Sequence, residues 1–350
     1  GASSGRMSSR PRRDVASGVG LPGTTQAVPP QRAARIQMLG TSRMASRLAE
    51  FSSMWALECG SFCLQSQTMS ALPPDTQSQR GKVVSIRPTG SDGVVLEVQP
   101  EVALGQLGAG RFFMLRRNGP SSPAIPRPFS LYRQGENGNL EFLIKVIGPG
   151  TEALAEAHLG EDIQVLGPLG RGWPEMPSDG KPLVMLAGGI GSAPFHIALR
   201  DALRGTQDRA AVAPENLHLI YGGRHQGLLY DIEQFEELGP AVTACTDDGS
   251  RGFHGNVVQA LEDHWQAGRL PEDVRLWTCG PEPMMNAVVR LAEKRGLDCW
   301  LSLETYMGCG VGICNGCAVF TREEGSLGDW PVAKCCLDGP VFAACDVRLD

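Results

Sequence analysis

Five of the eleven cysteines of this 350-residue chain are clustered near its C-terminus, at Cys309, Cys314, Cys317, Cys335 and Cys336. The first three are spaced C-x4-C-x2-C, which is the plant-type ligand spacing for a 2Fe–2S cluster. Glycines between these thiols allow a tight loop, whose amide N–H groups can point at the sulfurs. A structural zinc site and unliganded thiols are the alternatives, but zinc sites usually carry C-x2-C pairs at both ends. The spacing therefore favours a 2Fe–2S cluster.

An electron-transfer centre needs a second redox group, and two motifs further upstream could hold one. Arg127-Pro128-Phe129-Ser130 stands at the start of a predicted strand. Arginine can pair bidentately with a pyrophosphate, proline fixes the chain's approach, and the serine can hydrogen-bond the edge of a flavin ring. About twenty residues later, Gly150-Thr151 opens a predicted helix, whose N–H groups can bind phosphate. Each motif is common alone, but their order and spacing indicate a flavin site.

A third group of residues has the pattern of a nucleotide site. Gly188, Gly189 and Gly191 follow a buried-strand run, and a helical pattern comes after them. This order puts a phosphate at a helix N-terminus, although the spacing is not G-x-G-x-x-G. Loops after later strands carry Asp247 and Cys279-Gly280-Pro281.

These loops can share one crevice, because ligands of parallel sheets bind beyond the carboxyl ends of the strands. Asp247 and Asp248 favour ribose hydroxyls, and hence NAD, over a 2′-phosphate. Arg224 favours NADP, so the choice between NAD and NADP is left open.

The elements that would position these residues fall into three regions. Residues 79–177 show short strand signals at Lys82–Arg87, Val94–Val98, Phe112–Arg116, Phe129–Tyr132, Leu140–Ile147 and Asp162–Leu166, with a helix at Thr151–Leu159. Such a series predicts an antiparallel β-barrel. Residues 178–300 alternate strands and helices, which predicts a parallel α/β domain. Residues 301–350 form a small cysteine-rich domain, so we expect a multi-domain α+β protein.

Composition excludes several other classes. The net charge of −6 indicates no broad basic surface for nucleic acid, and no apolar run approaches the ~20 residues of a membrane span. The first 50 residues are rich in Arg and Ser and poor in acids. We expect residues 1–78 to be a disordered or non-core extension, with a transit peptide or a start site placed too early as alternatives.

Taken together, these motifs resemble one family. The pattern Glu304-x-x-Met-x-Cys-Gly-x-Gly-x-Cys-x-Gly-Cys, followed by Cys336-x-Asp-Gly-Pro-Val-Phe, is similar to that of class B dihydroorotate dehydrogenase electron-transfer subunits. Residues 246–252 and the two flavin motifs also fit, and the likeness extends over approximately residues 80–346. The family belongs to the ferredoxin-reductase superfamily, in which an FAD barrel precedes a nicotinamide domain.

The resemblance implies FAD, NAD and a 2Fe–2S cluster as cofactors. It implies cofactor contacts by Arg127, Pro128, Phe129, Ser130, Lys145, Gly150, Thr151, Gly188, Gly189, Gly191, Asp247, Cys279, Gly280 and Pro281, with no catalytic acid or base. Cys309, Cys314, Cys317 and Cys336 would be the metal ligands, and Cys335 a neighbouring thiol.

The resemblance also implies a cytoplasmic partner. An FMN-containing subunit would oxidise dihydroorotate to orotate in a heterotetramer, and electrons would pass through the cluster and FAD to NAD. A flavin subunit of a sulfide dehydrogenase or of a ferredoxin–NADP reductase-type complex is the alternative, and a non-catalytic redox sensor is a third reading.

Overall fold

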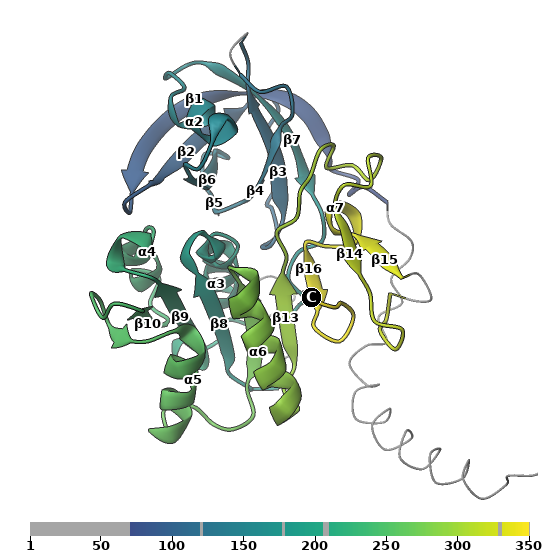
Figure 1. The fold of residues 1–350 in the computed structure, drawn as a ribbon. Helices are drawn as coiled ribbons and strands as arrows, with labels where there is room; N and C mark the ends of the chain where they lie inside the picture. The colour runs from purple at the N-terminus through teal and green to yellow at the C-terminus, as the bar shows by residue number, and fades with distance from the viewer. Residues whose placement is uncertain (1–70, 120–121, 177–178, 206–209, 328–330, 350) are drawn as a thin grey trace, which may run out of the picture. The chain divides into compact units, whose positions relative to one another are not determined.

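The computed structural model describes residues 71–119, 122–176, 179–205, 210–327 and 331–349. All of them belong to one compact unit, in which three groups of secondary structure pack together (Figure 1). The predictions for the Arg- and Ser-rich leader fall on residues 1–70, which lie outside the described residues.

The first group is an antiparallel sheet of seven strands with one short helix. Its order is β4-β3-β7-β1-β2-β6-β5, and every neighbouring pair is antiparallel. The elements are β1 (Gln77–Thr89), β2 (Gly93–Pro100), β3 (Phe112–Arg117), β4 (Arg127–Ser130), β5 (Arg133–Gln134), β6 (Leu140–Lys145), α2 (Pro149–Ala155) and β7 (Asp162–Leu169). Because β4 and β5 are its two edges, the sheet is an open half-barrel.

The two elements that carry the flavin motifs differ in their bounds from the sequence prediction. The strand expected at Phe129–Tyr132 is β4, which begins at Arg127 and ends at Ser130, so the whole Arg-Pro-x-Ser motif lies in a strand. The helix expected at Thr151–Leu159 begins at Pro149 and ends at Ala155. Proline is tolerated in the first helical turn, where its missing N–H has no intrahelical partner to lose.

The second group is a mostly parallel sheet with the order β11-β10-β9-β8-β12-β13-β16. Its strands are β8 (Leu183–Gly188), β9 (Leu217–Gly223), β10 (Ala241–Thr246), β11 (Phe253–His254), β12 (Arg275–Cys279), β13 (Cys299–Ser302) and β16 (Val341–Ala343). Its helices are α3 (Phe195–Arg204), α4 (Ile232–Glu236), α5 (Val257–Gln266) and α6 (Glu282–Arg295), with short 3-10 turns at Gly189–Ser192, Pro214–Asn216 and Gln226–Leu228.

The central strands of this second sheet are buried, as its parallel topology requires. Every residue of β8 and of β12 is buried, as expected for central parallel strands covered on both faces. Local signals mark the bounds of two helices: the side chain of Asn256 caps the start of α5, and Gly296 in a left-handed conformation ends α6. The one antiparallel neighbour is β16, which returns from the C-terminal region to pair with β13.

The third group is small and holds the cysteine loop. It consists of that loop, the two-stranded sheet of β14 (Ala318–Phe320) and β15 (Val332–Lys334), and α7 (Cys335–Asp338). The buried Cys317, Cys335 and Cys336 belong to the same hydrophobic core as Phe112 and Met114 of the half-barrel. The predicted fold class, a multi-domain α+β protein with an antiparallel β-barrel, a parallel α/β domain and a C-terminal cysteine domain, is confirmed, and the barrel is an open half-barrel.

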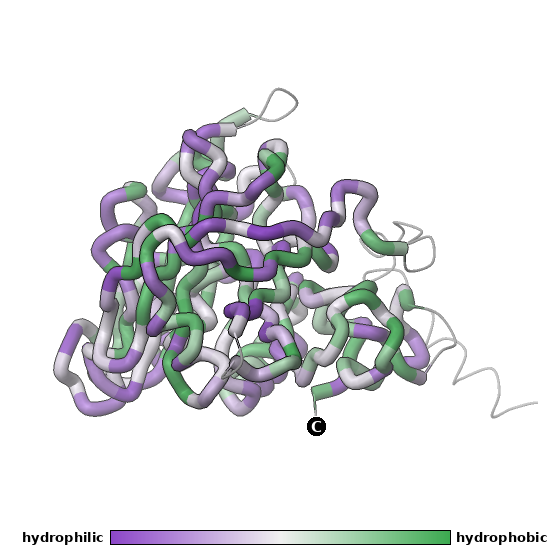
Figure 2. Tube along the Cα trace, turned by 90° about the horizontal axis from the view of Figure 1, so that it is seen from above, coloured by the Kyte–Doolittle hydropathy of each residue, from purple (hydrophilic) through white to green (hydrophobic). Residues whose placement is uncertain are grey.

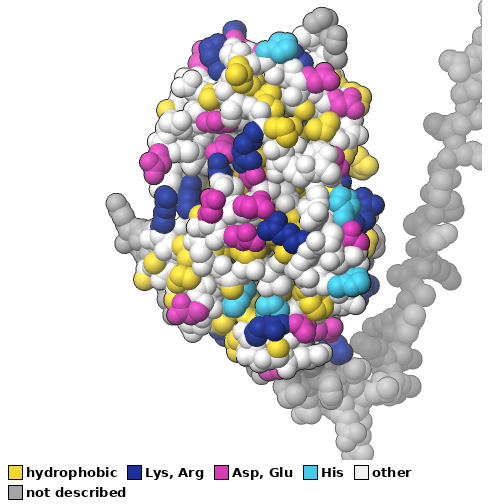
Figure 3. Space-filling model, turned by 90° about the vertical axis from the view of Figure 1, so that its left-hand side faces the viewer, with side chains coloured by type: hydrophobic (Ala, Val, Ile, Leu, Met, Phe, Trp, Pro, Cys, Tyr) yellow, Lys and Arg dark blue, Asp and Glu magenta, His cyan; other side chains and the backbone are white. Residues whose placement is uncertain are grey.

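Hydropathy follows this arrangement. Figure 2 shows hydrophobic and hydrophilic stretches alternating along the chain, with many hydrophilic stretches at the outer turns of the trace. On the face seen in Figure 3, acidic and basic side chains lie among one another. Within the described residues, we find no helix with the length and apolar character needed to cross a membrane.

Candidate cofactor sites

The two predicted flavin motifs lie against each other in the half-barrel. Arg127 comes from β4, and Gly150 from the first turn of α2. A Cβ atom added to Gly150 would lie 2.9 Å from Nε of Arg127 and 3.1 Å from its Cζ. A side chain at position 150 would push the Arg127 guanidinium aside. Glycine therefore allows the two motifs to form one cradle.

The remaining flavin candidates surround this cradle. Pro128, Phe129 and Ser130 are half-buried on the same edge strand. The Thr151 hydroxyl accepts hydrogen bonds from the backbone N–H groups of Ile147 (2.9 Å) and Gly148 (3.1 Å), which fixes the turn. Lys145, at the end of β6, lies with Nζ 3.6 Å from Oδ2 of Asp92.

The two predicted nicotinamide loops meet at the carboxyl edge of the parallel sheet. Gly188 ends β8, and Gly191 lies in the 3-10 turn that follows, while Cys279 ends the neighbouring strand β12. A Cβ atom on Gly191 would lie 2.4 Å from the carbonyl oxygen of Cys279, and one on Gly280 would lie 2.9 Å from Cα of Gly188. Glycine is required here because two backbones pack against each other.

Asp247 lies at the same edge, after β10. Its side chain is exposed, and its backbone N–H donates to the Gly223 carbonyl at 3.1 Å, which ties it to the end of β9. Asp248 accepts the N–H of Ser250 at 2.9 Å and so caps its own turn. Since β10, β9, β8 and β12 are consecutive in the sheet, all four predicted nucleotide loops lie along one edge.

Sequence reasoning gave Glu304 no cofactor role. Glu304 follows β13 and reaches solvent, yet dense packing around it raises the pKa of its carboxyl group. Burial raises the pKa of the Cys279 thiol, and the charge of Glu304 adds to that effect. The only signal in the sequence was its place in the Glu-x-x-Met-x-Cys pattern, which did not show that its charge acts on the Cys279 thiol.

The cysteine loop brings its thiols together as two pairs. The Cys309 Sγ accepts the backbone N–H groups of Val311 and Cys314, each at 3.4 Å, and interacts with the Cys314 thiol. The Cys317 and Cys336 Sγ atoms lie 3.2 Å apart.

Hydrogen bonding favours the thiolate form at two of these positions. The N–H of Gly316 contributes most to lowering the pKa of Cys314, to about 7. Contact with the Cys336 thiol lowers the pKa of Cys317 to about 6, and the same contact raises the pKa of Cys336.

Cys335 is oriented away from these pairs. Its Sγ is fully buried and lies 3.6 Å from the Leu303 carbonyl, and burial raises its pKa to about 12. Among the described residues, no three His, Cys, Asp or Glu side chains form a group suited to a single metal ion. Each iron of a 2Fe–2S cluster takes two cysteine thiolates, so two pairs of thiols with N–H groups on their sulfurs fit that group.

The cysteine loop rests directly on the half-barrel. A Cβ atom on Gly310 would lie 2.6 Å from Cγ of Met114 in β3 and 3.1 Å from Cδ1 of Leu169 in β7. Since β3 is also the neighbour of β4, the loop and the Arg127 strand flank the same strand. The predicted cluster ligands and flavin contacts therefore belong to adjoining elements.

Comparison with known proteins agrees with this geometry. Three family models match: an oxidoreductase FAD-binding domain at residues 91–173, an oxidoreductase NAD-binding domain at residues 185–290, and the iron–sulfur cluster binding domain of dihydroorotate dehydrogenase B at residues 304–348.

Among curated proteins, the chain is 32% identical over 241 residues to a dihydroorotate dehydrogenase B (NAD(+)) electron transfer subunit of Desulforamulus reducens, covering 68% of this chain and 86% of that one. It is 35% identical over 270 residues to the one of Geobacillus thermodenitrificans, covering 74% and 96%. The chain belongs to this family of electron transfer subunits.

A solved structure of an NADH-dependent reduced ferredoxin–NADP oxidoreductase shares the fold, with a TM-score of 0.64 and 23% identity over 77% of this chain and 90% of that one. As a member of the family, the chain is an NAD-linked flavin and iron–sulfur oxidoreductase subunit with FAD, NAD and iron–sulfur binding domains. The resemblance inferred from the motifs is thus confirmed, and the zinc alternative for the cysteine loop is not supported.

Proposed function

We propose that this chain passes electrons between NAD and a separate FMN-containing subunit that oxidises dihydroorotate to orotate. The observation that carries the proposal is the packing of the cysteine loop, through Gly310, on the half-barrel strand next to the Arg127 strand. When bound, FAD exchanges a hydride with NAD(H) and single electrons with the 2Fe–2S cluster, and it is the redox group that links the two.

The chain's own residues bind and orient these groups. In this proposal Arg127, Ser130, Gly150 and Thr151 hold the flavin and its pyrophosphate, with Pro128, Phe129 and Lys145 beside them. The Gly188–Gly191 turn and the Cys279–Pro281 loop hold the nicotinamide nucleotide. Cys309 and Cys314 would ligate one iron, and Cys317 and Cys336 the other. No general acid or base is needed, because a hydride carries both electrons.

The partner would dock where the cysteine loop faces solvent. Cys314 is exposed, and the two most exposed large hydrophobic side chains beside it are Tyr306 (94%) and Ile313 (80%). Large exposed apolar side chains are typical of interaction sites when they gather around a functional group. We propose that this surface meets the FMN subunit in a cytoplasmic heterotetramer; a cytoplasmic location agrees with a loop of reduced thiols.

NAD is the proposed nucleotide. The exposed carboxylate of Asp247 lies at the sheet edge, where it can accept ribose hydroxyls and would repel a 2′-phosphate. The ratio of kcat/KM for NADH to that for NADPH tests this choice. A preference for NADPH would contradict it.

The function is tested by reconstitution. The purified protein should show flavin absorbance with an iron–sulfur shoulder, and NADH should reduce ferricyanide through it. Mixed with an FMN subunit that oxidises dihydroorotate, it should reduce NAD with dihydroorotate as electron donor. Activity only with sulfide or ferredoxin as the second substrate would favour the alternative complexes, and no NADH-dependent dye reduction at all would favour a redox sensor.

A pair of surface variants tests the docking site. Ile313→Ser should weaken the complex with the FMN subunit in a pull-down titration, without loss of flavin or iron. The matched control is Leu159→Ser. Leu159 is 71% exposed and lies just before the start of β7, whereas the cysteine loop packs on Leu169 at the end of that strand. Equal affinities for the two variants would show that the partner binds elsewhere.

A further inference from the structure

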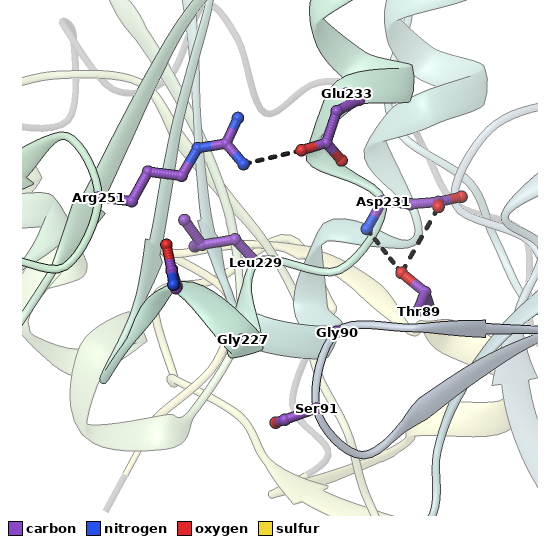
Figure 4. Close-up of a pocket in the computed structure, with 9 residues that line it drawn as sticks. Thr89, Gly90, Ser91, Gly227, Leu229, Asp231, Glu233 and Arg251 are labelled. Carbon is purple, nitrogen blue, oxygen red and sulfur yellow. Dashed lines mark hydrogen bonds and ion pairs between the residues drawn. The ribbon is translucent and has the colours of Figure 1, made fainter.

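Asp231, in the loop after β9, is inserted into the half-barrel and is bonded on every side. Its side chain is only 8% exposed. The Arg87 guanidinium donates to both carboxylate oxygens, with 2.6 Å between Nη1 and Oδ1, and the Tyr132 hydroxyl donates to Oδ2 at 3.0 Å. Its backbone N–H donates to Oγ1 of Thr89 at 2.9 Å, and Figure 4 shows these two residues facing each other.

The backbone conformation of Asp231 also indicates that the half-barrel holds this loop in place. It has a φ of +53°, in the left-handed region that non-glycine residues rarely occupy. Such a strained conformation persists only where the surroundings determine it. The bonds from the half-barrel are those surroundings, so the loop takes this shape because of the contact between the two sheets.

Contacts with the half-barrel also hold the preceding residue, Tyr230. Its ring packs on the β1–β2 turn, where a Cβ atom added to Gly90 would lie 2.7 Å from the ring and one added to Gly93 would lie 2.9 Å away. Its hydroxyl donates to Oδ1 of Asp92 at 2.5 Å. We call the Tyr230–Asp231 pair with its half-barrel partners the joint.

Hydrogen bonds and one ion pair connect the joint with both predicted cofactor sites. On the nucleotide side, the Ser192 hydroxyl, which closes the glycine turn, donates to the Tyr221 hydroxyl at 2.9 Å, and Tyr221 donates to the Tyr230 carbonyl at 3.1 Å. On the flavin side, Asp92 also contacts Lys145, with 3.6 Å between Oδ2 and Nζ. The joint thus links the turn proposed for the nucleotide to the strand proposed for the flavin.

One side of the joint borders an open pocket. A cavity of about 420 Å³ lies beside it, lined by Thr89, Gly90, Ser91, Gln226, Gly227, Leu229, Asp231, Glu233 and Arg251 (Figure 4). Two further bonds join this region to the half-barrel, one from the Ser91 N–H to the Gly227 carbonyl, at 2.8 Å, and one from the Arg133 guanidinium to the Gln234 side chain. Leu228, Leu229 and Tyr230 are buried in the same core cluster as Tyr132 and Leu143 of the half-barrel region, so this packing and the bonds of Tyr230 and Asp231 together place the loop.

We propose that Tyr230 and Asp231 are positioning residues that set the nicotinamide turn at the right distance from the flavin strand. The proposal rests on the proposed function, in which a hydride passes directly between two rings. Such a transfer needs the reacting atoms about 3–3.5 Å apart, and a displacement of about 1 Å can cost about 100-fold in rate. Neither residue needs to touch a cofactor for this role.

Two variants remove single elements of the joint. Asp231→Asn keeps the shape but removes the charge that Arg87 binds, and Tyr230→Phe removes only the hydroxyl that reaches Asp92. The matched control is Glu161→Gln. Glu161 has an equivalent bidentate pair with Arg117, at 2.7 and 3.0 Å, wholly within the half-barrel.

The measurements separate positioning from general stability. In the loaded protein, we expect both joint variants to keep their FAD and iron content, to reduce flavin with NADH at least 10-fold more slowly in stopped-flow, and to lose long-wavelength charge-transfer absorbance. In cofactor-free protein, we expect faster hydrogen exchange in peptides containing Ser91 and residues 226–231. Glu161→Gln should lower the melting temperature without changing either readout.

Several results would overturn the proposal. One is flavin reduction within twofold of wild type in both joint variants with unchanged exchange at Ser91. Another is an equal loss of rate in Glu161→Gln, which would assign the effect to overall stability. If Asp231→Asn does not fold, Tyr230→Phe decides alone. If the wild-type protein itself is not reduced by NADH, the proposed function fails, and the exchange measurement still decides whether the joint holds the two sheets.

Discussion

Gly191→Ala is the substitution whose effect the structure specifies most directly. An alanine Cβ atom at this buried position would lie 2.4 Å from the carbonyl oxygen of Cys279, 2.6 Å from its carbonyl carbon and 2.7 Å from Cα of Gly280. All three atoms belong to the backbone, so no side chain can rotate away to make room. The turn after β8 and the loop after β12 must move apart.

The size of the effect follows from these distances. Ordinary contact begins at 3.4 Å, so the Cys279 peptide must move by about 1 Å, the difference between 3.4 and 2.4 Å. Overpacking of a well-packed site costs about 1–3 kcal/mol. For a domain of this size that lowers the melting temperature by roughly 2–12 °C. A shift of about 1 Å at a reacting centre can cost about 100-fold in rate.

Thermal unfolding and stopped-flow reduction of flavin by NADH measure the two effects. The control is Gly108→Ala, since a Cβ atom there meets nothing within 4 Å, and we expect its stability to stay within about 0.5 kcal/mol of wild type. We expect Gly191→Ala to lose both stability and rate of reduction. A Gly191→Ala protein that melts and is reduced like the control would refute the close approach of the two loops.

Three further predictions follow from individual contacts. Cys336→Ser should abolish the iron–sulfur absorbance and the bound iron, while Cys335→Ser keeps them; the reverse would exchange the two assignments. Hydrogen bonds from Arg275 lower the pKa of Asp179 to about 2. Stability from this pair is therefore present above the ordinary value near 4 and is lost as the pH falls toward 2. The difference in urea midpoint between wild type and Asp179→Asn should shrink from pH 6 to pH 3, whereas a constant difference would contradict the ion pair. Phe342→Ala removes a ring that is only 2% exposed and should cost about 3–5 kcal/mol in denaturant unfolding of the cofactor-free protein; a loss below about 1 kcal/mol would mean that β16 is not part of the core.

The elements with strong local signals were predicted well from the sequence. The central parallel strands are unbroken apolar runs, since both of their faces are buried. Capping chemistry accounts for the start of α5 after Asn256 and for the end of α6 before Gly296. The candidate sites were predicted for the same reason, because the spacing of a motif reflects its local geometry. The Arg127 and Gly150 motifs are in contact, and the thiol of Cys336, rather than that of Cys335, lies beside the Cys317 thiol.

Short strands left too little pattern to predict. β5 has two residues, and β16 has three, so neither offers the alternation that identifies a strand. β16 was missed for a second reason as well, since it belongs to the cysteine-rich region in sequence but completes the nucleotide sheet in space. Pairing between segments about 40 residues apart has no signature in either segment alone.

The contacts of the joint could not be predicted from the sequence. Arg87 and Asp231 are 144 positions apart, each is an ordinary charged residue in its own segment, and neither belongs to a motif. Cofactor binding can be predicted from the sequence because the proposed contacts lie in short motifs, whose residues are close together along the chain. Electron transfer between cofactors depends instead on distances between segments, and those are set by contacts of this unpatterned kind. Substitutions at the joint should therefore leave cofactor content intact and change the rate between cofactors, whereas substitutions in the motifs should change cofactor content first.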